Sequence, residues 1–75
     1  MTIQELNKYK VSFIRNKTGK TIYGQPVEVV DEGNLFRIQE LHVIWKSTVE
    51  IIEKTEDVVK IIHKNGDWVE LGVVE

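Results

Sequence analysis

The residues that could perform acid–base or metal chemistry are few and far apart along the chain. The 75-residue sequence contains two histidines, His42 and His63, and no cysteine. Their separation fits no recognised ligand spacing, so we predict no metal site. Glu40, Glu50 and Glu53 could exchange protons, but no nucleophile, phosphate-binding loop or oxyanion donor accompanies them. Because so small a core cannot preorganise a deep pocket, we predict a protein that is not an enzyme and that has no cofactor or small-molecule substrate.

Basic side chains are the second group of residues that could carry a function. Several of them fall in the first third of the chain, namely Lys8, Lys10, Arg15, Lys17 and Lys20. Acidic residues gather in the second half, and the formal net charge is −2. Nucleic-acid-binding domains usually carry a basic excess. This composition therefore allows either one basic face on an acidic body or a solvated surface of mixed charge.

The length of the chain restricts how it can be stable. With 75 residues it forms one domain and hides only about 60% of its unfolded surface. The absence of cysteine and of a Cys/His cluster excludes disulfides and structural metals, so self-association remains as a source of further burial. No apolar run approaches the ~20 residues of a membrane span, and residues 1–10 lack the apolar core of a signal peptide. We therefore predict a cytoplasmic protein that contacts no membrane.

The sequence predicts short strands after one short helix. Residues 2–8 are expected to be helical, with Thr2 as the cap and Glu5 completing a capping box. Beyond them, Val, Ile, Thr and aromatic residues occur in short runs broken by Gly, Asn and Asp, a pattern typical of strands. The runs predict strands at 9–14, 20–30, 36–39, 43–45 and 49–52, with tight turns at 16–19, 31–34 and 46–48.

In the second predicted strand, the alternation of apolar residues shifts by one position halfway along. Ile22 belongs to one face, whereas Val27 and Val29 fall on the other, and Pro26 lies between them. Proline cannot donate to a strand ladder and is tolerated at bulges and edges. We predict a bulge near Gln25–Pro26 that returns these aliphatic side chains to one face.

The last third of the chain predicts a charged linker at 54–57 and then a hairpin at 58–74. Its turn is Asn65–Gly66, the strongest two-residue hairpin signal, because both turn positions need a positive φ. A turn of two residues sets the cross-strand pairs, Ile62 with Val69 and His63 with Trp68. We interpret this hairpin, from about residue 57 onward, as an addition to a core that ends near residue 53.

Many short strands behind a short helix predict a small closed or partly closed barrel. The expected fold class is all-β: a strongly bent Sm-like or SH3-like barrel with a short N-terminal helix and an extra C-terminal hairpin, in one domain over residues 1–75. OB-like barrels fit the same pattern, and the pattern alone does not choose among them.

Two segments of the predicted barrel carry a family resemblance. Residues 19–24 read Gly-Lys-Thr-Ile-Tyr-Gly, and Asp31, Asn34 and an apolar run at 35–38 follow them. Residues 43–52 read Val-Ile-Trp-Lys-Ser-Thr-Val-Glu-Ile-Ile. Together they resemble the Sm/Lsm superfamily, which includes bacterial Hfq. The first segment is similar to the motif in which a bent second strand begins, and the second to the motif with an aromatic and a basic residue at a tight corner.

The resemblance implies a homo-oligomeric ring that binds single-stranded RNA. In the family, the fourth strand of one subunit pairs with the fifth strand of the next, which closes edges that are otherwise open. The two motif loops meet at the ring pore, where Lys46 would face a phosphate and Asn34 a base edge. Two features depart from the Hfq pattern. The turn at 32–34 lacks the aromatic on which bases stack, and Ser47 stands in place of a histidine.

Other residues complete the candidate RNA-binding set. Tyr23 and Trp45 could stack on bases, and a basic turn could contact phosphates. The full set is Asn34, Lys46, Ser47, Asp31, Tyr23, Trp45, Arg15, Lys17 and Lys20. Each class also has a structural interpretation. The turn residues serve their own turns, which we prefer for Asp31, the aromatics pack in a core or interface, and the basic residues are solvated.

Two further functions fit the same sequence. An SH3-like module that binds protein through its edge strands is favoured by the acidic balance and by the missing stacking aromatic. A viral or phage assembly component without a nucleic-acid ligand is the third interpretation. Mass in solution, together with any nucleic acid that the purified protein carries, distinguishes these possibilities.

Overall fold

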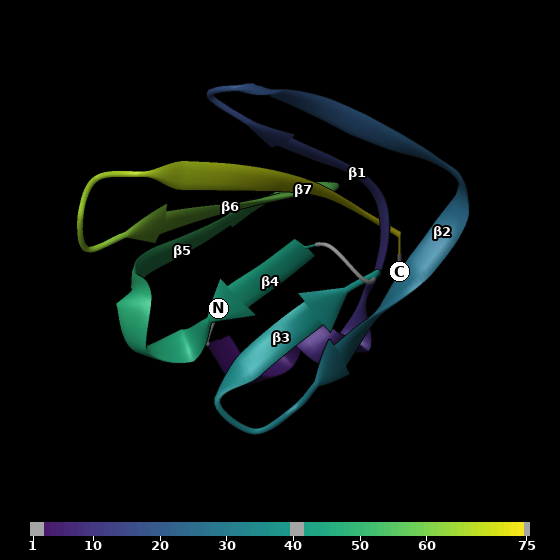
Figure 1. The fold of residues 1–75 in the computed structure, drawn as a ribbon. Coiled ribbons are helices and arrows are strands. Elements are labelled where there is room, and N and C mark those ends of the chain that lie inside the picture. Colours follow the sequence, from purple (N-terminus) through teal and green to yellow (C-terminus); the bar gives the residue numbers. More distant parts are fainter. Residues whose placement is uncertain (1–2, 40–41, 75) are drawn as a thin grey trace.

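The chain consists almost entirely of β-strands (Figure 1). A computed structural model describes residues 3–39 and 42–74, which contain seven strands and two short 3-10 helices. The elements are η1 (Ile3–Lys8), β1 (Lys10–Asn16), β2 (Gly19–Asp31), β3 (Leu35–Ile38), β4 (His42–Trp45), η2 (Lys46–Thr48), β5 (Val49–Thr55), β6 (Val58–His63) and β7 (Trp68–Val74).

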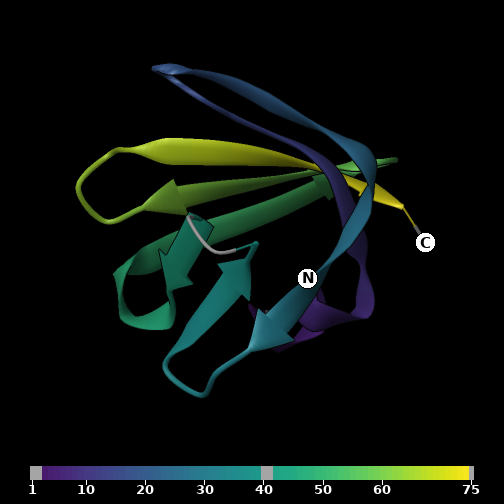
Figure 2. The ribbon, with the colours of Figure 1, turned by 45° about the vertical axis from the view of Figure 1, so that its right-hand side comes forward.

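The strands form one antiparallel sheet in the order β4-β3-β2-β1-β7-β6-β5. The sheet curls into a half-barrel because β2 is shared: its first part pairs with β1, and Val29–Asp31 pair with β3 (Figures 1 and 2). The predicted all-β class is thereby confirmed. The curl brings the two outer strands, β4 and β5, onto the same side of the molecule, where the short helix η2 joins them.

Alternating aliphatic residues fill the concave side of the half-barrel. Val59 and Ile61 of β6 are fully buried, whereas Lys60 between them is half-buried on the other face. This alternation follows from the two-residue period of a strand. The fully buried large side chains are Phe36, Leu6, Ile38, Ile61, Leu71, Val11 and Val59. They come from η1 and four of the strands, β1, β3, β6 and β7, so burial of apolar surface holds the two halves of the sheet around one core.

The predicted N-terminal helix is present as the 3-10 helix η1. It packs against β2 and places Leu6 in the core. The expected capping box involves Thr2, which lies outside the described residues, and the side chain of Glu5, which is not described either. No helix in the described segments is long and apolar enough to cross a membrane.

The irregularity expected in β2 is larger than a simple bulge. Val11 pairs with Val27 and Phe13 with Ile22, so residues 23–26 of β2 lie opposite Ser12 alone. The prediction of a break near Pro26 is confirmed, but its consequence is not. Ile22 stays 72% exposed, and Tyr23 packs against the core instead.

The register of the final hairpin is one residue away from the predicted register. Ile62 pairs with Trp68, and Ile61 pairs with Val69. The predicted pairs of Ile62 with Val69 and His63 with Trp68 are therefore wrong. A two-residue turn needs positive φ at both positions, but only Gly66 of the pair has it, at 93°. The turn instead takes three residues and closes with the bond from the His63 N–H to the Asp67 C=O at 2.7 Å.

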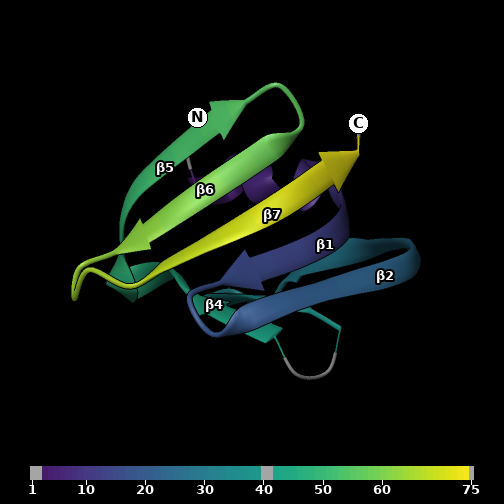
Figure 3. The ribbon, with the colours of Figure 1, turned by 90° about the horizontal axis from the view of Figure 1, so that it is seen from above.

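The hairpin of β6 and β7 is not set apart from the rest of the sheet. Half of the segment expected to be a linker belongs to β5, which continues to Thr55, and Glu56–Asp57 form a short turn. β7 pairs with β1, and β6 pairs with β5 (Figure 3). The interpretation of residues 54–57 as a linker is wrong, because β6 and β7 lie in the interior of the sheet between β1 and β5.

Candidate functional site

A cavity of about 310 Å³ lies between β4 and the tips of the β1–β2 and β6–β7 hairpins. Its floor is aliphatic and includes Ile14, Ile38, Ile44 and Leu71, none of them more than 4% exposed. Polar residues from three elements and two turns form its rim: Asn16, Lys17, Thr18, His42, His63 and Asp67. An apolar floor with a polar rim is typical of a binding site, and the volume falls at the small end of the usual range.

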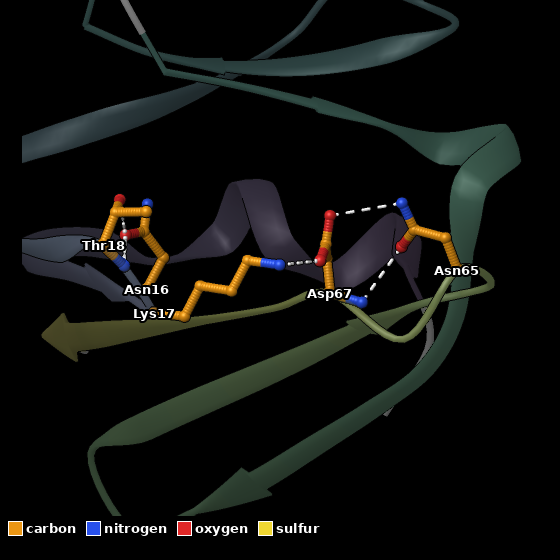
Figure 4. A network of polar contacts seen from close by, with 5 residues as sticks. All are labelled: Asn16, Lys17, Thr18, Asn65 and Asp67. Carbon is orange, nitrogen blue, oxygen red and sulfur yellow. Dashed lines mark hydrogen bonds and ion pairs between the residues drawn. The ribbon is translucent and has the colours of Figure 1, made fainter.

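The rim residues at the hairpin tips are bonded mainly to one another (Figure 4). Lys17 Nζ donates to Asp67 Oδ1 at 2.6 Å, which joins the two tips. Asn16 Oδ1 accepts from the Thr18 N–H and hydroxyl, and Asn65 Oδ1 accepts from the Asp67 N–H. The hydrogen bond and charge of Lys17 lower the pKa of Asp67 below its usual value. This part of the rim is thus internally neutralised and offers a ligand little net charge.

A hydrogen-bond chain at the rim determines the tautomer of His63. The Thr48 hydroxyl donates to the Trp45 C=O at 2.9 Å and also lies 3.0 Å from His63 Nδ1. Because a hydroxyl has a single proton, Nδ1 must be the donor in the second contact. Neutral His63 therefore keeps its lone pair on Nε2.

Strand β4 borders the cavity and leaves one edge unpaired in the described part of the chain. The Lys46 N–H donates to the Asn34 C=O at 3.1 Å. Backbone groups alternate in direction along an antiparallel strand, so those of Ile44 also point toward β3 and those of Val43 and Trp45 point away. The Trp45 C=O is taken by Thr48. The N–H groups of Val43 and Trp45 and the Val43 C=O remain directed at the open edge.

Five of the predicted RNA-binding residues come together at the corner beyond β4. Lys46 Nζ donates to Asp31 Oδ1 at 2.7 Å, and the same carboxylate accepts from the Gly33 N–H. The second bond confirms the structural role preferred for Asp31. The lysine lowers the pKa of Asp31 below its usual value. The other three residues, Asn34, Trp45 and Ser47, are exposed beside this ion pair.

The other predicted residues lie elsewhere on the sheet. Arg15 Nε donates to Glu70 at 2.7 Å, and its guanidinium lies 5.6 Å from the Trp68 ring centre. Lys17 belongs to the cavity rim, and Lys20 covers the Phe13 ring. The structure thus separates the predicted set into a corner, a cavity rim and an outer face.

Tyr23 is the exception among the predicted residues, because it faces the interior. Its hydroxyl is buried without a hydrogen-bond partner among the described residues, and burial raises its pKa. The ring meets His42 edge-on at 6.5 Å between centres. This position is unsuitable for stacking on a base, and it agrees with the core-packing interpretation.

The sequence interpretation overlooked most of the cavity. Of its polar rim, only Lys17 was in the candidate set, while His42 and His63 were considered only as metal ligands or packing residues. No group of three or more His, Cys, Asp or Glu side chains in the described residues could hold a metal ion. One signal was available: Asn16 to Thr18 and Asn65 to Asp67 are both hairpin tips, but only the β1–β7 pairing brings them side by side.

Comparison with known proteins finds no family model, no curated protein and no solved structure that matches the chain. The Sm/Lsm resemblance therefore remains a prediction from motif order and spacing. The geometry of the cavity and of the sheet edges is what indicates a function.

Proposed function

We propose that this protein is a non-enzymatic protein-interaction module that binds an extended segment of a partner protein as an added strand on β4. The supporting observation is the edge of β4 that no described strand pairs with and that borders the cavity. Trp45 at the end of this strand is 48% exposed to solvent. An extended peptide on such an edge gains affinity from main-chain hydrogen bonds and specificity from pockets for alternate side chains.

The composition of β4 suits this kind of partner. Its residues, His42 to Trp45, include no carboxylate or ammonium group that would oppose an incoming strand. Neighbouring strands lie about 4.8 Å apart, so an added strand would lie over the mouth of the cavity. Every second side chain of that strand would then face the concave side. The aliphatic floor favours a branched apolar side chain there.

The charges support protein rather than RNA as the partner. Lys46, Lys17 and Arg15 each form an ion pair with a carboxylate of the chain, and Lys20 lies over an aromatic ring. RNA affinity comes largely from cations that release counterions from phosphates. In each of the three ion pairs, the carboxylate offsets the positive charge that a phosphate would meet. The RNA-binding ring is therefore the less supported function.

A proline substitution tests the proposal at one backbone atom. Peptides of random sequence would be selected against the intact protein, and their affinity measured by fluorescence anisotropy. Val43→Pro removes an N–H that points away from β3, so the β3–β4 ladder stays intact. We expect about a tenfold loss of affinity, from one hydrogen bond and the steric bulk of the ring.

The matched control is Val43→Thr, which keeps the N–H and the branched shape and should bind as the parent does. Circular dichroism would establish that both variants fold. Equal affinity of Val43→Pro and the parent would exclude strand addition at β4. Copurification of RNA, seen in the absorbance ratio at 260 and 280 nm, would favour the RNA-binding alternative.

A further inference from the structure

Strand β5 forms the opposite edge of the sheet and is the longer of the two (Figure 3). Its open backbone groups follow from bonds elsewhere in the sheet. The His63 N–H donates to the Asp67 C=O and the Val73 N–H to the Asp57 C=O. The odd-numbered residues of β6 therefore face β7, and the even-numbered ones face β5. The Lys64 N–H, which donates to the Thr48 C=O at 2.8 Å, fits this assignment.

The register with β6 then gives the direction of each β5 residue. Ile62, Lys60 and Val58 face Ile51, Glu53 and Thr55. These β5 residues therefore direct their backbone groups inward, toward β6. Ile52 and Lys54 direct theirs away from the sheet. In the described part of the chain, no strand pairs with this outer side of β5.

We propose that β5 pairs antiparallel with β5 of a second copy of this chain, about a two-fold axis at Ile52. Ile52 is the central residue of Val49–Thr55, so this register pairs the whole strand with its counterpart. It also sets Ile52, whose backbone groups point outward, against itself. A two-fold contact of this kind is self-complementary and closes at a dimer.

The charges of β5 select the same register. With Ile52 on the axis, Glu50 lies opposite Lys54 of the second copy, and the contact occurs twice by symmetry. Ile51, 44% exposed, lies opposite Glu53 and diagonal to Ile51 of the second copy. A shift of the axis to Glu53 would oppose two like charges, which is unfavourable. Charges usually protect an edge from pairing, but here they restrict it to one register.

Two local features are compatible with this pairing. Lys54 Nζ donates to the Glu56 C=O at 2.6 Å and lies 5.5 Å from the Tyr9 ring centre. An ammonium has further N–H donors, so it can also donate to Glu50 of the second copy. The register between β5 and β6 shifts between Val49 and Ile51, so Glu50 is the extra residue of β5 at this point.

The dimer uses a different edge from the peptide site on β4, so it does not depend on the proposed function. The chain also has a physical reason to dimerise. A chain of 75 residues buries a modest core, and small domains without disulfides or metals often gain stability by association. Continuation of the sheet across β5 would bury Ile51 and pair the outward backbone groups of Ile52.

Charge reversal tests the register directly. Sedimentation equilibrium over a wide range of protein concentration gives the dimer affinity. Glu50→Lys and Lys54→Glu each place like charges in both symmetric contacts, and each should weaken the dimer about tenfold. The double variant restores opposite charges and should return most of the affinity. Glu28→Lys, the same charge change on exposed β2, is the matched control and should leave the affinity unchanged.

Amide hydrogen exchange gives a second readout that does not depend on the variants. The N–H group of Ile52 should become protected as the protein concentration rises, whereas that of Val43 should not. A protein that stays monomeric at its highest soluble concentration would overturn the proposal. So would a dimer that ignores both reversals, or an assembly that Val43→Pro dissociates, since the last result would indicate β4–β5 pairing in a ring.

Discussion

The two outer strands of the sheet differ in length, charge and surroundings. Strand β4 has four residues, no carboxylate or ammonium group, and a cavity beside it. Strand β5 has seven residues, three of them charged, and an irregular register near its start. Both edges have outward backbone groups, so hydrogen bonding alone does not distinguish their partners.

These differences indicate how the composition of an edge strand can favour one kind of partner. On β5, Glu50 and Lys54 make the pairing energy depend on register, and this favours a strand with the complementary order of charges. On β4, the pocket makes the energy depend on the side chain that enters it. We therefore propose different partners for the two edges: a second copy of the chain for β5 and a segment of another protein for β4.

The largest expected effect comes from a substitution in the hydrophobic core, which supports both edges. Leu71 is fully buried and lies on the cavity floor. Leu71→Ala should lower the free energy of unfolding by about 2–5 kcal/mol, through lost burial and the space left behind. Urea denaturation would measure this. The matched control is Ile22→Ala on an exposed side chain, which should change it by less than about 0.5 kcal/mol. Equal losses in the two variants would contradict the assigned core.

The next largest effects test whether the two edges bind their partners independently. Val43→Pro should weaken peptide binding about tenfold and leave the dimer affinity unchanged. Glu50→Lys should do the reverse, since it alters the charge pairing of β5 alone. Anisotropy and sedimentation equilibrium on the same protein samples would measure both quantities. If either variant changed both, the edges would be coupled, and their separate roles would be disproved.

A smaller expected effect tests whether the Trp45 C=O belongs to the edge site on β4. Thr48→Val removes the hydroxyl that occupies the Trp45 C=O. The loss of that hydrogen bond should lower the free energy of unfolding by about 1 kcal/mol. The freed carbonyl can accept a bond from an added strand, so peptide affinity should rise by about threefold. Thr48→Ser, which keeps the hydroxyl, is the control, and weaker peptide binding by Thr48→Val would show that the carbonyl is not part of the edge site.

The smallest effect concerns the ion pairs on the β4 side. The pKa values of Asp67 and Asp31 are lowered by Lys17 and Lys46. Lowered values in the folded state add stability above the ordinary aspartate value of 3.8, and this stability is lost as the pH falls through the folded values. Both carboxylates are exposed, so the loss is small.

An NMR titration of the two carboxyl groups would check this prediction. Lys17→Met should raise the pKa of Asp67 and leave that of Asp31 in place. Equal movement of both groups would indicate a general charge effect rather than the two assigned pairs.

Short-range sequence signals located most of the elements. The Gly and Asn turns at 16–19 and 31–34 and the corner at 46–48 are where the structure has them. The Asn65–Gly66 signal found the hairpin but missed its register. A two-residue turn needs positive φ at both Asn65 and Gly66, but only Gly66 has it, and the Asn65 side chain is bonded to Asp67. A one-residue difference in a turn moves every cross-strand pair.

The sequence by itself determined that this chain is a small all-β domain with a buried aliphatic face, because the period of its apolar residues reports burial wherever the strands pair. It could not determine which strands are neighbours. The tertiary structure decided that β7 lies beside β1, which brings Lys17 to Asp67 and forms the cavity, and that β4 and β5 are left at the edges. Strand order depends on contacts between residues far apart in the chain, and these are governed by the whole core rather than by any local run of residues.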